Sequence, residues 1–110
     1  MLTTEILNRL RNNWGDKADA MACFAEARMI DPDSSWACYI LALNPFDDDE
    51  INCIIDGFTV EHTKWSLQAL LSTFNSSGNY VIFDIAYRPR RAAELFKTLC
   101  EGKENGTIEN

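Results

Sequence analysis

The sequence predicts an α+β domain in which an antiparallel sheet of about four strands carries helices packed on one face. Apolar residues recur at helical spacing near both ends of the chain, whereas runs in the middle alternate as strands do and are joined by short turns. The chain has 110 residues, of which 46% are hydrophobic and 25% charged, a composition typical of one globular domain. We expect the domain to span residues 1–102 and residues 103–110 to form a flexible C-terminal tail.

The first half of the chain is expected to form one helix and three strands. A helix over residues 4–13 has Thr3 as its cap and apolar residues along one face. Residues 20–30 alternate as in a strand, although their alanines would equally suit a helix, and we expect a strand. Residues 35–43 alternate strictly with apolar side chains on both faces, which places this strand in the centre of the sheet. With residues 51–56 as the next strand, the three form an antiparallel meander.

The second half is expected to add two helices and one strand. Ser66 begins a helix that runs to Phe74. Residues 80–87 form the fourth strand, and Pro89 opens a last helix that ends at Gly102. The predicted order is therefore α-β-β-β-α-β-α, and runs of strands flanked by helices are typical of an antiparallel sheet covered by helices.

The formal net charge of −7 lies entirely in the first half of the chain. Residues 1–60 hold eleven acidic and four basic side chains, whereas residues 61–110 hold six of each. Phosphate backbones repel such a chain at long range, so we expect no direct binding of nucleic acid. No apolar run reaches the length of a membrane span and the N-terminus has no secretory signal, so we expect a cytoplasmic protein that does not bind membranes.

The cysteines and the single histidine do not form a metal-binding pattern. The cysteines are far apart in the sequence and include no Cys-x-x-Cys pair. Cysteines among apolar residues usually behave as small core residues, and we expect all four to be reduced thiols. They are Cys23, Cys38, Cys53 and Cys100. We therefore expect no metal and no other cofactor.

Short motifs occur along residues 2–99 in the order of the expected elements. They are Pro32, Trp36 and Tyr39 at the central strand, Asp56-Gly57 after the next one, Glu61, Trp65-Ser66-Leu67 and Leu70-Leu71 at the second helix, and then Asp84, Pro89 and Leu95. In these residues the chain resembles a bacterial family of unknown function that is carried mainly on plasmids and other mobile elements. It departs from the family pattern at Cys38, Asn52-Cys53 and Glu61-His62-Thr63. The resemblance implies a fold and a mobile-element setting, and it supplies no activity and no catalytic residue.

The densest run of charge is Asp47-Asp48-Asp49-Glu50, in the loop between two expected strands. A calcium loop is excluded, because the carboxylates are consecutive and Asn52 occupies the position that needs glycine. A charge run between strands is usually a solvated loop. As a functional site, this run would imitate phosphate charges at the basic groove of a partner protein.

Arg88, Arg90 and Arg91 form the only basic cluster, at the start of the last expected helix. As an anion-binding site they could hold a phosphate or a carboxylate, since arginine forms paired hydrogen bonds with both. Because the chain is acidic overall, we expect them instead to pair with carboxylates of the first half.

The sequence contains no recognisable catalytic centre, and we expect a non-enzymatic domain that binds a protein with a basic surface through the acidic run. On a mobile element, the partner would be a host-defence protein, as for an anti-restriction or anti-CRISPR inhibitor. The alternative is a small enzyme or ligand-binding protein with a pocket near Glu61, His62, Asp84 and Arg88. Against it, we expect His62 to be a surface loop histidine. A third option is an accessory protein that forms a homodimer through the edge of its sheet.

Overall fold

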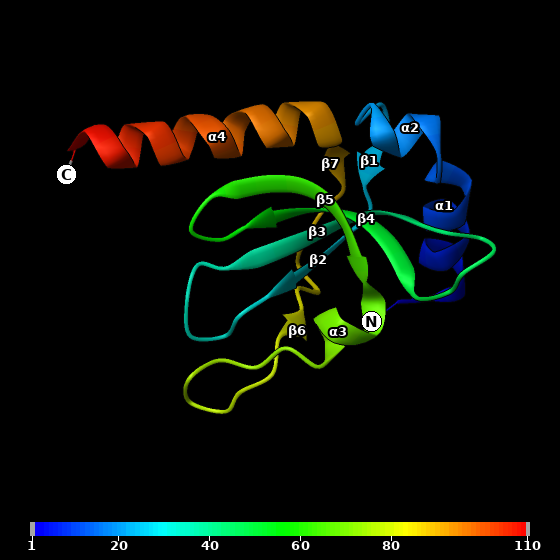
Figure 1. Ribbon diagram of the computed structural model, residues 1–110, viewed down its shortest axis with the longest axis horizontal. Coiled ribbons are helices and arrows are strands. Elements are labelled where there is room, and N and C mark those ends of the chain that lie inside the picture. Colours follow the sequence, from blue (N-terminus) through cyan, green and yellow to red (C-terminus); the bar gives the residue numbers. More distant parts are fainter. Residues whose placement is uncertain (1, 110) are drawn as a thin grey trace.

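A computed structural model describes the backbone of residues 2–109 and the side chains of residues 2–104 (Figure 1). The helices are α1 (Thr4–Asn13), α2 (Asp16–Asp19), α3 (Leu67–Leu71) and α4 (Ala92–Glu109). The strands are β1 (Phe24–Ala25), β2 (Ala27–Ile30), β3 (Ala37–Leu43), β4 (Glu50–Asp56), β5 (Val60–Ser66), β6 (Ile82–Phe83) and β7 (Arg90–Arg91). An antiparallel sheet has the order β5-β4-β3-β2-β6, and β1 pairs with β7 in a second, small sheet. The predicted α+β class with an antiparallel sheet is confirmed.

Helix α1 begins and ends where the sequence predicts. The Thr3 hydroxyl accepts a hydrogen bond from the Ile6 amide at 3.2 Å, which satisfies one of the free donors of the first turn. After the helix, Gly15 has a φ of 95°, a conformation that glycine adopts at little cost. This turn leads into the short helix α2, which the sequence analysis does not predict.

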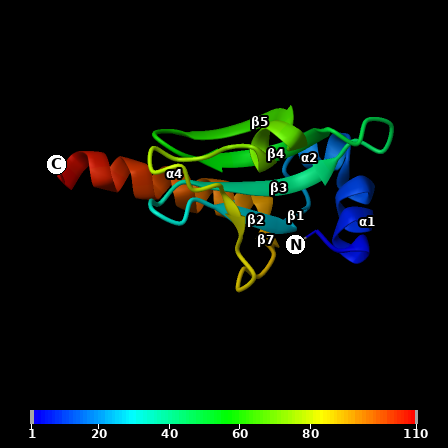
Figure 2. The same cartoon turned by 90° about the horizontal axis from the view of Figure 1, so that it is seen from below.

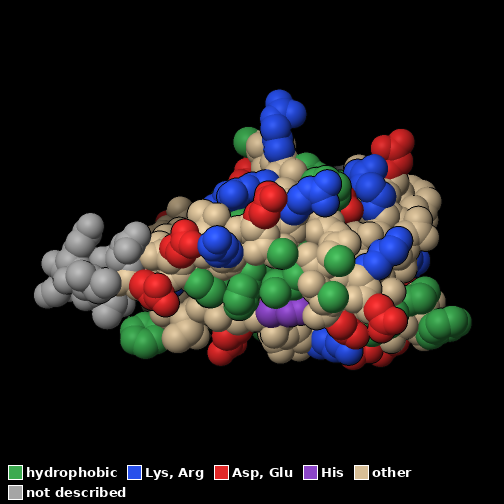
Figure 3. All heavy atoms as spheres, turned by 90° about the horizontal axis from the view of Figure 1, so that it is seen from above, with side chains coloured by type: hydrophobic (Ala, Val, Ile, Leu, Met, Phe, Trp, Pro, Cys, Tyr) green, Lys and Arg blue, Asp and Glu red, His purple; other side chains and the backbone are tan. Residues whose placement is uncertain are grey.

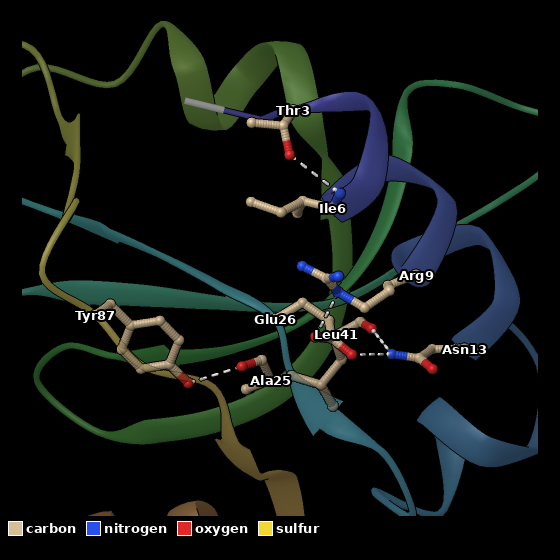
Figure 4. A network of polar contacts seen from close by, with 8 residues as sticks. All are labelled: Thr3, Ile6, Arg9, Asn13, Ala25, Glu26, Leu41 and Tyr87. Carbon is tan, nitrogen blue, oxygen red and sulfur yellow. Dashed lines mark hydrogen bonds and ion pairs between the residues drawn. The ribbon is translucent and has the colours of Figure 1, made fainter.

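The strand predicted over residues 20–30 is present from Phe24 onward but is broken at Glu26. The Glu26 carboxylate is buried there and is held by α1 (Figure 4). Asn13 Nδ2 donates to Glu26 Oε2 at 3.1 Å and to the carbonyl oxygen of Leu41 at 3.0 Å. Arg9 Nε lies 3.4 Å from Glu26 Oε1. The first helix is therefore fastened to the sheet through a buried polar group that has partners.

Strand β3 is central and fully buried, as predicted, but its alternation is not strict. The pairing with β4 shifts between Ile40 and Ala42, so that β3 carries a bulge at Leu41. Leu41 and Ala42 both belong to the core beside α4, whereas Leu43 belongs to the core beside α1. The prediction of an unbroken alternation is therefore wrong beyond Leu41.

Helices cover both faces of the sheet, so the prediction of helices on one face is wrong. One buried cluster contains Leu10 of α1 and Leu70 of α3, and the other contains Ala18 of α2 and Leu95 of α4. Figures 1 and 2 show α4 running along one face, while α1 crosses one end of the sheet. A central strand that is apolar on both sides requires a cover on both sides.

Strand β5 follows β4 in a tight hairpin and is absent from the predicted elements. It pairs with β4 along seven residues, from Glu50↔Ser66 to Asp56↔Val60. Gly57 stands at the turn because a Cβ there would lie only 3.1 Å from Cδ1 of Trp36. The second helix is shorter than predicted and ends at Leu71, although Ser66 caps it by accepting from the Ala69 amide at 3.1 Å.

The C-terminal elements differ in length from the predicted ones. The predicted strand over residues 80–87 is reduced to Ile82–Phe83, because Tyr80 forms an isolated bridge with Phe74 and a turn at residues 85–86 ends the extended segment. Pro89 does not open the last helix, since Arg90 and Arg91 are extended and pair with β1. Helix α4 begins at Ala92 and passes through Gly102 to Glu109, so the predicted end at Gly102 is wrong. Within the described residues, no helix combines the length and apolar composition that crossing a membrane requires.

Candidate functional site

The loop of residues 44–50, here called the acidic loop, is fixed by its own hydrogen bonds. Asn44 Oδ1 accepts from the Phe46 amide at 2.8 Å, and Asn44 Nδ2 donates to Glu50 Oε1 at 2.9 Å. Asp47 Oδ1 accepts from the Asp49 amide at 3.0 Å. Two backbone bonds between residues 44 and 50 and between 47 and 50 close the turn. The carboxylate of Glu50 and one oxygen of Asp47 are thus used to shape the loop.

Asp49 joins the acidic loop to the start of α3. Its Oδ2 accepts from the Ser66 hydroxyl at 2.7 Å, and its Oδ1 accepts from the Gln68 amide at 2.8 Å. These two bonds lower the pKa of the Asp49 carboxyl below its ordinary value, and the bond from Ser66 has the larger effect. Asp49 therefore acts as a second cap for this helix, together with Ser66.

The tip of the acidic loop presents an aromatic ring beside the remaining charge. The Phe46 side chain is 96% exposed, and Asp47 and Asp48 follow it on the surface. The Asp48 carboxylate is 83% exposed and lies 3.7 Å from Arg11, a distance at which an exposed ion pair contributes little. A surface hollow of about 320 Å³ separates the loop from Lys64 and Trp65 of β5. Of the predicted contact residues, Asp49 and Glu50 build the loop and Asp48 is displayed by it, while Asp47 is exposed and also shapes the turn with one oxygen.

The predicted pairing of the C-terminal arginines with carboxylates is wrong. Arg88 and Arg90 are exposed and make no ion pair with a carboxylate among residues 2–104. Arg91 stacks on the ring of Phe24, with its guanidinium carbon 5.3 Å from the ring centre. The carboxylates of the first half pair instead with Arg9, Arg11, Lys64 and Lys103, and Arg28 pairs with Asp84. Two of the three candidate anion-binding arginines are therefore available for a ligand.

The four residues of the alternative pocket do not come together. Glu61 and His62 lie on β5 at one edge of the sheet, whereas Asp84 follows β6 at the opposite edge. Asp84 and Arg88 do line one pocket, which contains neither Glu61 nor His62. A single site that uses all four side chains is excluded by this separation.

His62 is a half-buried strand residue, so the expectation of a surface loop histidine is wrong. Its Nε2 lies 2.8 Å from Asn52 Oδ1, and Asn52 Nδ2 donates to Asp19 Oδ1 at 3.2 Å. Asn52 Oδ1 accepts, so His62 Nε2 carries the hydrogen. Burial lowers the pKa of the imidazole below its ordinary value. The three side chains form a polar chain that satisfies Asn52, which is 2% exposed.

The cysteines remain thiols and do not gather at a site. Cys38 and Cys53 are buried on neighbouring strands, and the hydrogen bond between the two thiols, together with burial, raises the pKa of Cys38 well above its ordinary value. Burial also raises the pKa of Cys23. Both shifts oppose formation of the nucleophilic thiolate. In the part of the chain with described side chains, no three His, Cys, Asp or Glu residues converge in a way that could hold a metal ion.

Two features of the surface were not predicted from the sequence. Phe46 carries a local signal, since an aromatic residue between a proline and a run of carboxylates has no obvious place in a core. The ion pair between Arg28 and Asp84 has no local signal in the sequence. The two residues come from separate parts of the chain, and only the pairing of β2 with β6 brings them together.

Comparisons of the chain with protein-family models, curated proteins and solved structures give no match. The resemblance to a mobile-element family therefore stays a prediction.

Proposed function

We propose that the protein is a non-enzymatic binding domain that contacts a basic partner protein through the acidic loop. The observation that carries this proposal is Phe46, which is 96% exposed at the tip of a loop held by its own hydrogen bonds. Asp47 and Asp48 stand beside it and give the tip its negative charge.

The loop combines two properties that protein contacts use. An aromatic side chain that becomes buried on binding is a frequent source of affinity, and neighbouring carboxylates speed the encounter with a basic surface. Because the loop is already ordered by Asn44 and Glu50, less conformational entropy is lost on binding than for a flexible segment. Phe46 therefore serves as the anchor, and Asp47 and Asp48 serve to steer the partner.

The net charge of −7 favours a partner whose surface is positively charged. A nucleic-acid-binding groove is such a surface, and a loop of this kind would occlude it. An inhibitor of a host-defence protein, of the anti-restriction or anti-CRISPR type, is the narrower form of the proposal, and the size and charge of the chain support it.

The chain offers a matched pair of variants for the test. Phe46→Ala removes the proposed anchor, whereas Phe58→Ala removes an equally exposed ring, 101%, from the turn between β4 and β5. The immobilised wild-type protein first selects partners from bacterial lysate, and each purified partner is then measured against every variant by surface plasmon resonance. We expect Phe46→Ala to raise the dissociation rate by about tenfold, and Phe58→Ala to leave it unchanged.

The charge of the loop is tested separately with Asp47→Asn combined with Asp48→Asn. This variant should slow association and flatten its dependence on salt, because steering by exposed charges is screened by ions. If the purified partner binds all three variants as it binds the wild type, the acidic loop is not the contact surface. Retention of a nuclease or methylase with the expected pattern would support the narrower role.

A further inference from the structure

A pocket of about 340 Å³ lies beside the segment that joins β6 to α4, on the face of the sheet covered by α4. Its polar lining consists of Arg28, Tyr39, Asp84, Tyr87, Arg88 and Arg90. We propose that this pocket binds the phosphate group of a small phosphorylated molecule.

Arg28 forms a fixed wall of the pocket. One terminal nitrogen of its guanidinium lies 3.2 Å from Asp84 Oδ2, and the guanidinium carbon stands 5.4 Å from the centre of the Tyr39 ring. The Arg28 Nε is buried and has no hydrogen-bond acceptor among the described residues. Because this nitrogen has almost no accessible surface, Arg28 contributes its positive charge to the wall of the pocket and not its Nε hydrogen.

The segment that carries Arg88 and Arg90 is also held in place. The Tyr87 hydroxyl donates to the Ala25 carbonyl at 2.8 Å (Figure 4), and the Tyr87 ring packs on Tyr39 with 5.7 Å between the ring centres. Burial is the main reason why the pKa of Tyr87 is raised to about 12, so this hydroxyl keeps its proton at neutral pH. On the far side of Tyr87, the pairing of Arg90 with Ala25 fixes the backbone of β7.

The charge of the lining selects the class of ligand. Three arginines and one aspartate give the pocket a formal charge of +2, within a protein whose net charge is −7. Figure 3 shows basic side chains gathered along one margin of this face, on the side away from the histidine. A phosphate monoester carries nearly two negative charges at neutral pH, whereas a carboxylate carries one. Arginine also binds phosphate oxygens through paired hydrogen bonds.

The pocket has room for more than an inorganic anion. Its volume lies at the lower end of the range for small-ligand sites, and Pro89 and Leu95 supply an apolar part of the lining. A phosphate on a small apolar or aromatic body therefore matches the pocket better than free phosphate does.

Phenyl phosphate is the probe for a titration followed by the amide NMR signals of Ala86 and Tyr87. We expect saturable shifts, and a dissociation constant about tenfold higher for Arg88→Gln and for Arg90→Gln. Arg91→Gln is the matched control, because Arg91 neighbours Arg90 on β7 but stacks on Phe24 and does not line the pocket. Binding should also weaken when the pH is lowered through about 6, where the phosphate becomes a monoanion.

Four results would overturn the proposal. Equal weakening by Arg91→Gln would indicate general attraction to basic charge. Binding of phenylacetate as tight as that of phenyl phosphate would indicate a carboxylate site, and equal binding of inorganic phosphate would exclude a role for the body of the ligand. Tighter binding of a short single-stranded oligonucleotide would indicate a nucleic-acid contact. Because the three substituted residues, Arg88, Arg90 and Arg91, are exposed, the variants should keep the fold, which circular dichroism would check.

Discussion

Four consecutive carboxylates in the acidic loop have four different surroundings. Asp49 accepts two hydrogen bonds at the start of α3, and Glu50 accepts one from Asn44. Asp47 accepts from a backbone amide within the turn, whereas Asp48 has only a long contact with Arg11. The run of charge is visible in the sequence, but the different roles of its four residues are not. The donors for Asp49 are Ser66 and Gln68, which lie 17 and 19 positions later in the chain.

Asp49→Asn should lower the urea midpoint of unfolding, whereas Asp48→Asn should leave it nearly unchanged. The reason is that the amide cannot replace both acceptors that Ser66 and Gln68 need. The pKa of Asp49 is lowered in the folded protein, so its stabilising effect is present above the ordinary value of 3.8 and is lost as the pH falls through the lowered value. The difference between Asp49→Asn and the wild type should therefore shrink in acid. Equal midpoints for the two variants at neutral pH would contradict the capping role.

At the scale of the elements, local sequence signals were sufficient to predict some helices and strands but not others. Helix α1 and strand β3 could be predicted because the cap, the spacing and the apolar alternation all lie within the element. Strand β5 could not, because polar residues occupy both of its faces and its strand conformation depends on pairing with β4. The path of residues 80–91 was equally hidden, since β7 forms by pairing with the distant strand β1.

One substitution tests whether helix α4 continues through Gly102 or ends there. A glycine inside a helix costs about 0.5–1 kcal/mol relative to alanine, and a Cβ at Gly102 would meet nothing within 4 Å. Gly102→Ala should therefore stabilise the protein by about that amount in urea unfolding. Gly78→Ala is the control and should destabilise it, since Gly78 has equal space but a φ of 82°. Destabilisation by Gly102→Ala would show that the helix ends there, as its sequence alone predicts.

At the scale of the whole molecule, the class of fold followed from the sequence and the layering did not. Apolar residues on both faces of β3 indicated a central strand, and the same observation required helices on both faces. Charge was harder to place, because three arginines of the first half neutralise carboxylates and two of the second half remain unpaired among the described residues. A homodimer through an edge of the sheet stays a prediction, which light scattering at several concentrations would test.

His62, the only histidine of the chain, should cause the change of stability with pH near neutrality. Burial lowers its pKa in the folded state, so the unfolded chain binds the proton more readily. Stability should therefore be complete above the ordinary value of 6.5 and fall as the pH drops through the lowered value. His62→Gln, which can still donate to Asn52, should lose less stability than the wild type between about pH 7 and pH 5 in urea unfolding. An identical loss in both proteins would show that the imidazole does not contribute.

Because of the bulge at Leu41, the number of residues in β3 is constrained as well as their type. Residues after Leu41 reach their proper sides only because one extra residue stands in the strand, and Asn13 donates to the carbonyl of that residue. If the same residues ran as a regular strand without the bulge, Leu43 would turn toward α4 and leave a void beneath α1. Natural variants of this chain should consequently tolerate exchanges among apolar residues in β3 far better than an insertion or deletion outside the bulge, which would turn all the residues beyond it to the opposite face.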